Sequence, residues 1–174
     1  QNDVICQNAE LTQRLVELFE LRFDPGRPED PEAEEALRAE ILERLDDVVS
    51  LDHDRILRNQ LGVIDATLRT NAYKPGRGAL AFKLRSAEVP ALPQPAPLME
   101  IFVCGKDVEG IHIRGGLIAR GGLRWSERQD YRTEVWGLMR AQMVKNAVIV
   151  PVGSKGGFVV KRPPAPTGSV DADR

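Results

Sequence analysis

The apolar residues of this 174-residue chain change their spacing near Gly78, and this change divides the chain into two kinds of structure. Before Gly78, three stretches repeat an apolar residue every three to four positions, as one buried face of an α-helix requires. After it, short apolar runs stand between turn residues, as in β-strands. The pattern predicts an α/β protein with a helical N-terminal segment followed by a partial mixed-sheet domain.

Three helices are expected in the first seventy residues. The first covers residues 9–23, where leucine and phenylalanine recur at helical spacing. The second begins at Pro31, which a first helical turn tolerates, and its apolar stripe continues to Val49. The third follows Ser50, a favourable N-cap residue, and its stripe ends with Leu68.

Strands and one more helix are expected in the second part. The expected strands cover residues 79–84, 98–103, 110–113 and 147–150, the helix covers 130–145, and the proline-rich run 90–97 is an extended spacer. We therefore divide the chain into a helical segment, residues 1–74, an α/β part, residues 75–162, and a flexible tail, residues 163–174.

The formal net charge of −2 hides a strong asymmetry between the two parts. Residues 1–49 hold 14 acidic and 5 basic residues, whereas residues 105–162 hold 11 basic and 5 acidic ones. A basic stretch of this kind indicates a surface that handles anions. A small carboxylate, a phosphate or a nucleic acid would each fit.

Other bulk features narrow the class of protein. The sequence holds no apolar run of eighteen residues and no basic leader before an apolar segment, which favours a cytoplasmic protein without a membrane partner. Cys6 and Cys104 are far apart and only two histidines accompany them, so neither a disulfide nor a structural metal is expected.

Three basic residues stand out because their neighbours in the sequence would restrict where their side chains can lie. Arg120 and Lys155 each precede a Gly-Gly pair, where backbone N–H groups can meet an anion, although ordinary tight turns have the same composition. Lys145 lies in a last helical turn, where it could simply complement the helix dipole. Gln142 shares its stripe with buried residues, and a buried amide needs a partner such as a bound carboxylate.

Three motifs follow one another along the chain: A-R-G-G-L-R-W at residues 119–125, A-Q-M-V-K-N at 141–146 and P-V-G-S-K-G-G at 151–157. In this order they resemble the substrate domain of glutamate dehydrogenases, most closely the very long-chain NAD-specific bacterial subclass. The resemblance extends over about residues 50–162. It implies that the α/β part is a piece of the substrate-binding, dimerisation-type domain of that family.

The resemblance also implies roles for individual residues. Lys155 is the catalytic lysine, and Gln142 and Lys145 hold the α-carboxylate of the amino acid. Arg120 stands where the family has a lysine for the side-chain carboxylate, and its forked guanidinium can bind a carboxylate through two hydrogen bonds. The full substrate-binding set implied is Arg120, Gly121, Gly122, Gln142, Met143 and Lys145.

The activity implied is oxidative deamination of L-glutamate to 2-oxoglutarate and ammonium with NAD as the hydride acceptor, in an enzyme of amino acid catabolism that forms a homo-oligomer. No G-x-G-x-x-G follows an expected strand, so NAD would be bound by a domain absent from this chain, and the piece alone would be inactive. The alternative from another class is a phosphate- or nucleic-acid-binding module on residues 105–162. A third possibility is that the helical part serves oligomerisation.

Overall fold

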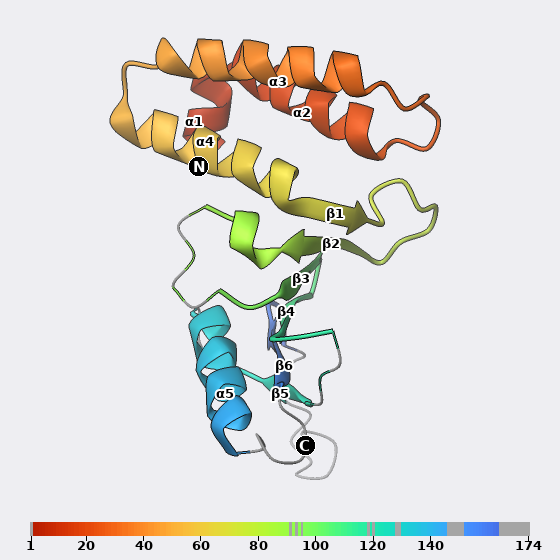
Figure 1. The fold of residues 1–174 in the computed structure, drawn as a ribbon, viewed down its shortest axis with the longest axis vertical. Helices are drawn as coiled ribbons and strands as arrows, with labels where there is room; N and C mark the ends of the chain where they lie inside the picture. The colour runs from red at the N-terminus through yellow and green to blue at the C-terminus, as the bar shows by residue number, and fades with distance from the viewer. Residues whose placement is uncertain are drawn as a thin grey trace.

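The chain forms a helical unit that stands at one end of a six-stranded sheet, with one further helix lying against the sheet (Figure 1). The structure is a computed structural model. It describes residues 2–90, 92, 94, 96–117, 119, 121–127, 130–145 and 152–163, and of Lys145 only the backbone. The α/β class expected from the sequence is confirmed.

Four helices form the N-terminal unit: α1 (Asn2–Gln7), α2 (Ala9–Phe23), α3 (Pro31–Asp46) and α4 (Leu51–Ala66). Side-chain caps fix two of their starts, because the Asp30 carboxylate accepts the Ala33 N–H at 3.0 Å and the Ser50 hydroxyl accepts the His53 N–H at 3.4 Å. The expected helices at 9–23, 31 onward and 51 onward are confirmed.

Two helix ends differ from expectation. Helix α3 ends at Asp46, so Val49, which we placed on its buried stripe, is 98% exposed. Helix α4 ends at Ala66, and the next four residues form strand β1 (Thr67–Thr70), which includes Leu68. The expectation of helix through Leu68 is wrong because pairing with a neighbouring strand outweighs the local helical pattern there.

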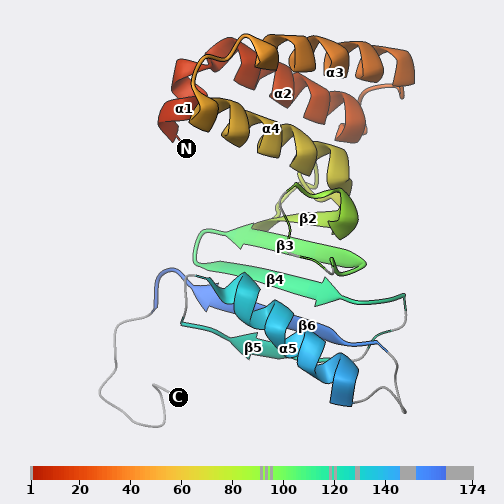
Figure 2. The same ribbon diagram turned by 60° about the vertical axis from the view of Figure 1, so that its left-hand side comes forward.

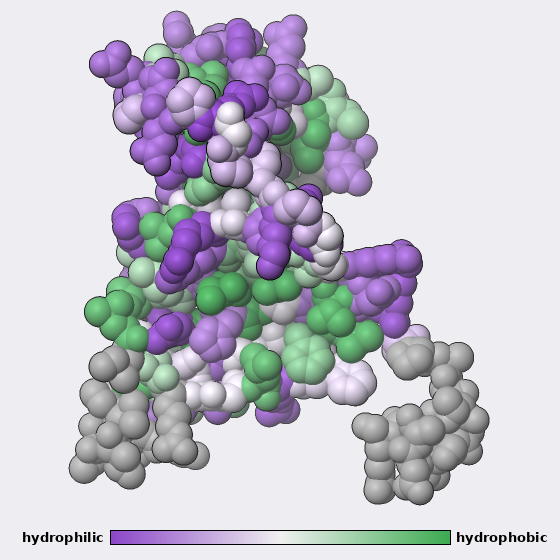
Figure 3. All heavy atoms as spheres, turned by 90° about the vertical axis from the view of Figure 1, so that its right-hand side faces the viewer, coloured by the Kyte–Doolittle hydropathy of each residue, from purple (hydrophilic) through white to green (hydrophobic). Residues whose placement is uncertain are grey.

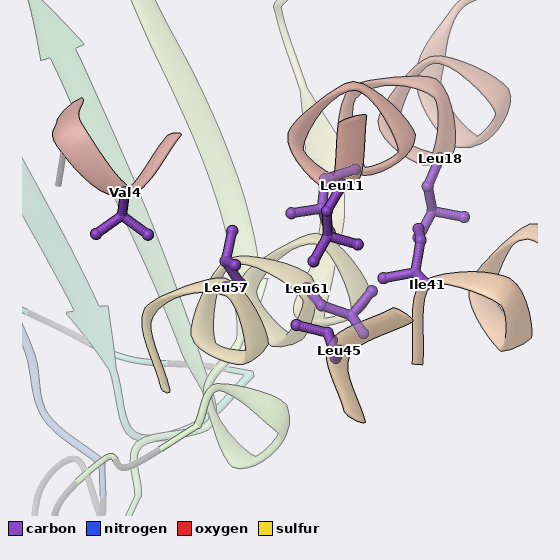
Figure 4. Packing of buried hydrophobic residues seen from close by; sticks show 8 residues of the cluster. Val4, Leu11, Leu18, Ile41, Leu45, Leu57 and Leu61 are labelled. Carbon is purple, nitrogen blue, oxygen red and sulfur yellow. The ribbon is translucent and has the colours of Figure 1, made fainter. Parts of the chain in front are cut away.

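An aliphatic core holds the helical unit together (Figure 4). All four helices contribute to it, and four of its members, Leu18, Ile41, Leu45 and Leu57, are fully buried. At about 25 cal/mol per Å² of apolar surface, such side chains supply most of the unit's stability. The buried cluster consists of Val4, Leu11, Leu15, Leu18, Ile41, Leu45, Leu57 and Leu61.

The other strands are β2 (Ala79–Arg85), β3 (Met99–Gly105), β4 (Val108–Arg114), β5 (Leu123–Trp125) and β6 (Ser154–Val160). Their order in the sheet is β1-β2-β3-β4-β6-β5, and all neighbours are antiparallel except β5 and β6. The expected strands β2, β3 and β4 are confirmed. Strands β5 and β6 were missed: β5 has only three residues, too few to show a period, and two glycines interrupt the apolar pattern of β6.

Helix α5 (Tyr131–Lys145) confirms the helix expected at 130–145 and lies along β4 and β6 (Figure 2). Its face toward the sheet carries Tyr131, Val135 and Met139, which pack on Ile111 and Ile113 of β4. The expected strand at 147–150 lies outside the described residues, as does the tail except for Pro163. The division at residue 74 stays a prediction, although β1 pairs with the sheet.

The opposite face of the sheet is open and apolar. Figure 3 shows hydrophobic side chains gathered across this face. Trp125 stacks on Phe158 there with ring centroids 6.3 Å apart, and Leu123 is 73% exposed. Apolar side chains of β5 are therefore exposed on this face of the sheet.

Candidate functional site

Strand β6 alternates its side chains between the two faces of the sheet, and this alternation places Lys155. Its register pairs Ile111 with Gly157 and Ile113 with Lys155, so Lys155 and Gly157 share the face that α5 covers. Lys155 is half-buried, and its side chain forms no hydrogen bond or ion pair with any other residue in the described ranges. A lysine in this position can bind an added anion.

The glycines of the third motif allow α5 to approach the backbone of β6. A Cβ atom on Gly157 would lie 2.4 Å from the Cγ2 atom of Val135, and one on Gly153 would lie 2.9 Å from the Met139 carbonyl oxygen. Any side chain at either position would push the helix away. Residues 155–157 lie within the regular strand β6. The tight turn that we considered there is therefore wrong.

Gly121 brings the first and third motifs together. A Cβ atom at this position would lie 1.3 Å from the Ser154 carbonyl oxygen and 3.3 Å from the Oε1 atom of Gln142. The Gly156 N–H donates to the Gly122 carbonyl at 3.0 Å, and β5 then runs parallel to β6. Gly121, the Gln142 amide and the residue before Lys155 therefore meet at one place.

The Met143 side chain packs beside Gly115 and Gly153. The Gly115 N–H donates to the Gly153 carbonyl at 3.0 Å, and a Cβ atom on Gly115 would lie 3.2 Å from the Met143 sulfur. The thioether therefore covers the ends of β4 and β6, where its flexible chain fills an irregular gap. Its assignment to the substrate-binding set stays a prediction.

The side chains of two of the three basic residues singled out in the sequence lie outside the described residues. Arg120 lies outside the described residues. Lys145 ends α5, three residues after Gln142, and its side chain is likewise outside them. The roles of Arg120 and Lys145 in binding the two substrate carboxylates therefore stay predictions.

Sequence reasoning missed a polar pair on the open face of the sheet, directly behind the site. The hydroxyl of Ser154, which is 4% exposed, lies 2.7 Å from Nε2 of His112. Burial lowers the pKa of His112, and the nearby Arg114 guanidinium lowers it further. Ser154 pairs with Arg114 and His112 pairs with Gly156, so the two side chains are diagonal neighbours across β4 and β6. This register is set only when the sheet folds, and no local pattern in the sequence indicates it.

Within the described residues, three basic residues of the stretch 105–162 are paired with carboxylates of the same chain. Arg132 binds Glu100, Arg124 binds Glu134 at 3.1 Å, and Lys161 binds Glu109 at 2.9 Å. The Lys161 ammonium is the main reason that the pKa of Glu109 is lowered. These pairs leave fewer free cations for a nucleic-acid backbone than the sequence suggested.

Within the described ranges, no three or more His, Cys, Asp or Glu side chains are grouped so that they could hold a metal ion. None of the helices in the part of the chain that the structure describes is long and apolar enough to cross a membrane.

Comparison with known proteins places the chain in a family. Residues 40–173 match the bacterial NAD-glutamate dehydrogenase catalytic domain. A protein of Halomonas elongata named NAD-specific glutamate dehydrogenase is 57% identical over 164 residues, which are 90% of this chain and 10% of that protein. Because the family match covers most of the chain, the chain belongs to this family.

Two further relatives carry the same name. The one from Mycobacterium tuberculosis is 50% identical over 98% of this chain and 11% of its own length. The one from Pseudomonas aeruginosa is 52% identical over 90% of this chain and 10% of its own length. This chain thus spans about a tenth of the length of the relatives it matches, and the resemblance inferred from the three motifs is confirmed.

Proposed function

We propose that this chain forms the glutamate-binding part of an NAD-dependent glutamate dehydrogenase, which converts L-glutamate to 2-oxoglutarate and ammonium. The observation that carries the proposal is the meeting of Gly121, Gln142 and the strand that bears Lys155. These residues come from three separate motifs, and the names of the relatives support the same activity. The finer assignment of residues 75–162 to a substrate-binding domain is part of the proposal.

In this reading each residue of the site has a distinct role. Gln142 and Lys145 hold the α-carboxylate of glutamate, and Arg120 holds the side-chain carboxylate through its forked guanidinium. A substrate with an apolar side chain would leave the Arg120 cation without a partner. The site therefore favours an amino acid whose side chain carries a second carboxylate. Gly121 and Gly122 let the substrate approach the backbone.

Lys155 is the proposed catalytic residue. It is half-buried without a charged partner among the described residues, which suits a group that exchanges protons with water and with the carbinolamine formed when water adds to the substrate iminium. The substrate carboxylates would supply the missing negative charge.

The residues present do not fit NAD itself. The single parallel strand–helix–strand unit described here runs β5-α5-β6, and residues 126–130 between its first strand and its helix read S-E-R-Q-D. This connection lacks the glycines that let a pyrophosphate approach a helix N-terminus. We therefore assign NAD binding to a part of the protein outside this chain, and expect the piece alone to be inactive.

The remaining expectations belong to the same proposal. We expect a homo-oligomeric, cytoplasmic enzyme in which neither a membrane nor a nucleic acid is a partner. The nucleic-acid-binding alternative is not favoured, because Arg124, Arg132 and Lys161 are already paired with carboxylates.

Substitution of Lys155 in the full-length protein tests the proposal. Lys155→Ala should abolish turnover of glutamate, whereas Lys145→Ala should mainly raise the KM for glutamate. Lys74→Ala, at an exposed turn, is the matched control and should behave as the unmodified enzyme. A near-normal kcat for Lys155→Ala, measured by NADH absorbance, would refute the catalytic role.

A further inference from the structure

The first turn of α5 is tied to three different strands of the sheet. The Tyr131 hydroxyl donates to Glu109 of β4 at 3.0 Å, and Arg132 donates to both carboxylate oxygens of Glu100 on β3, from Nε at 3.0 Å. Glu134 accepts from the Ser126 hydroxyl, at the end of β5, at 2.7 Å. These contacts fix where the helix begins.

Glu100 is the most deeply buried charged residue in the described ranges, at 3% exposure. Its cross-strand neighbours on the same face are Leu84 and Ile113, both buried and aliphatic. A carboxylate in such surroundings depends on its partner, and Arg132 meets both oxygens at a fixed angle. The pair is therefore directional as well as strong.

The last turn of α5 is held in a different way. There the helix lies on bare backbone, because Gly153 approaches Met139 and Gly121 approaches Gln142. These contacts fix how closely the helix approaches the sheet, but glycine offers no side chain that would fix the direction of the helix. The position of the last turn is thus set from the first turn, about 15 Å away along the helix axis.

We propose that the Glu100–Arg132 ion pair is a positioning device for substrate binding: it sets the placement of α5 on the sheet and thereby holds Gln142 over Gly121, beside the strand that carries Lys155. The inference rests on the proposed function. An apolar pair of similar volume would hold a helix and a sheet together equally well. What the ion pair adds is a fixed direction of approach, on which carboxylate-binding groups depend.

Replacement of the ion pair by apolar residues distinguishes an effect on the position of α5 from an effect on the stability of the fold. In the full-length protein, Glu100→Met combined with Arg132→Met should leave the Tm within a few degrees of normal. The KM for glutamate should rise about tenfold or more, because misplacing a binding group by 1 Å can cost about a hundredfold. The KM for NAD should not change. The matched control is Arg85→Met combined with Glu88→Met, an exposed pair between the end of β2 and the 3-10 turn that follows it, which should alter neither constant.

A second variant covers the case in which the double substitution does not fold. Arg132→Lys keeps the charge and loses the two-pronged geometry, so it should raise the KM for glutamate at a nearly unchanged Tm. A normal KM for glutamate in Arg132→Lys or in the double variant would overturn the inference. Equal rises in the KM for glutamate and for NAD would overturn it too, since they would indicate a general structural effect.

One further variant separates this inference from the proposed function. Gln142→Ala should raise the KM for glutamate if the substrate binds where we propose. If it does so and the Glu100 and Arg132 variants have no effect, only the positioning role is wrong. If Gln142→Ala itself leaves the KM unchanged, the proposed site is wrong.

Discussion

The helical unit and the α5-covered part of the sheet are packed by opposite means. In the helical unit, eight aliphatic side chains fill a common core, and the charged residues pair on its surface. Under α5, glycines bring backbone against helix, and the buried carboxylate of Glu100 holds the helix in place. Aliphatic cores tolerate changes of shape, whereas close backbone contact and directional pairs do not.

This difference indicates that the two regions contribute different properties to the protein. The helical unit contributes stability and none of the residues proposed to touch the substrate. The α5 region contributes geometry, because three motifs distant in the sequence must meet at Gly121. The two regions should therefore respond differently to substitution.

The largest effect is expected at Gly121. A Cβ atom there would lie 1.3 Å from the Ser154 carbonyl oxygen, so Gly121→Ala must displace the backbone of β6 beside Lys155. We expect kcat/KM for glutamate to fall about a hundredfold or more. Gly137→Ala is the control, since a Cβ atom there meets nothing within 4 Å. Initial rates of the two full-length variants decide, and equal activity would contradict the close contact.

A large loss of stability without a change in substrate affinity is expected in the helical core. Leu57 is fully buried, so Leu57→Ala should destabilise the unit by about 2–5 kcal/mol. Leu51→Ala removes the same atoms from a residue that is 85% exposed, and it should cost far less. Thermal unfolding measures the difference. A raised KM for glutamate in folded Leu57→Ala would show that the two regions are coupled.

A smaller effect should depend on pH and arise in the sheet. Because burial and then Arg114 lower the pKa of His112, the unfolded chain binds the proton more tightly than the folded one. The stability should therefore decrease as the pH falls below the ordinary value of 6.5 and be fully regained above it. His112→Gln should flatten this part of a plot of Tm against pH. An unchanged slope would contradict the assignment.

The smallest effect is expected on the surface of the helical unit. Arg58 meets Asp54 at 2.6 Å and Asp46 at 2.7 Å, with its side chain 41% exposed. Solvent screens such pairs, so Arg58→Gln should cost less than about 1 kcal/mol. The change in Tm should shrink further in high salt. A loss comparable to that of Leu57→Ala would mean that the apolar core does not dominate this unit.

Some elements of the two regions could be predicted from the sequence more accurately than others. Helices α2 and α5 and strands β2, β3 and β4 were expected close to their observed bounds, since each repeats a local period. Strand β6 was read as a glycine corner, because two adjacent glycines resemble a turn when their neighbours in space are unknown. Of the expected site residues, the structure brings Gly121 and Gln142 together beside the strand of Lys155.

What the sequence by itself determined are the features carried by neighbouring residues: the apolar stripes, the caps at Asp30 and Ser50, and the three motifs that identify the family. Only the tertiary structure decided which segments touch. It alone shows that Gly157 faces Val135, that Glu100 meets Arg132, and that β5 pairs with β6. The physical reason is range: local periodicity acts within a turn or a pleat, whereas these contacts join residues that are distant along the chain and meet only after folding.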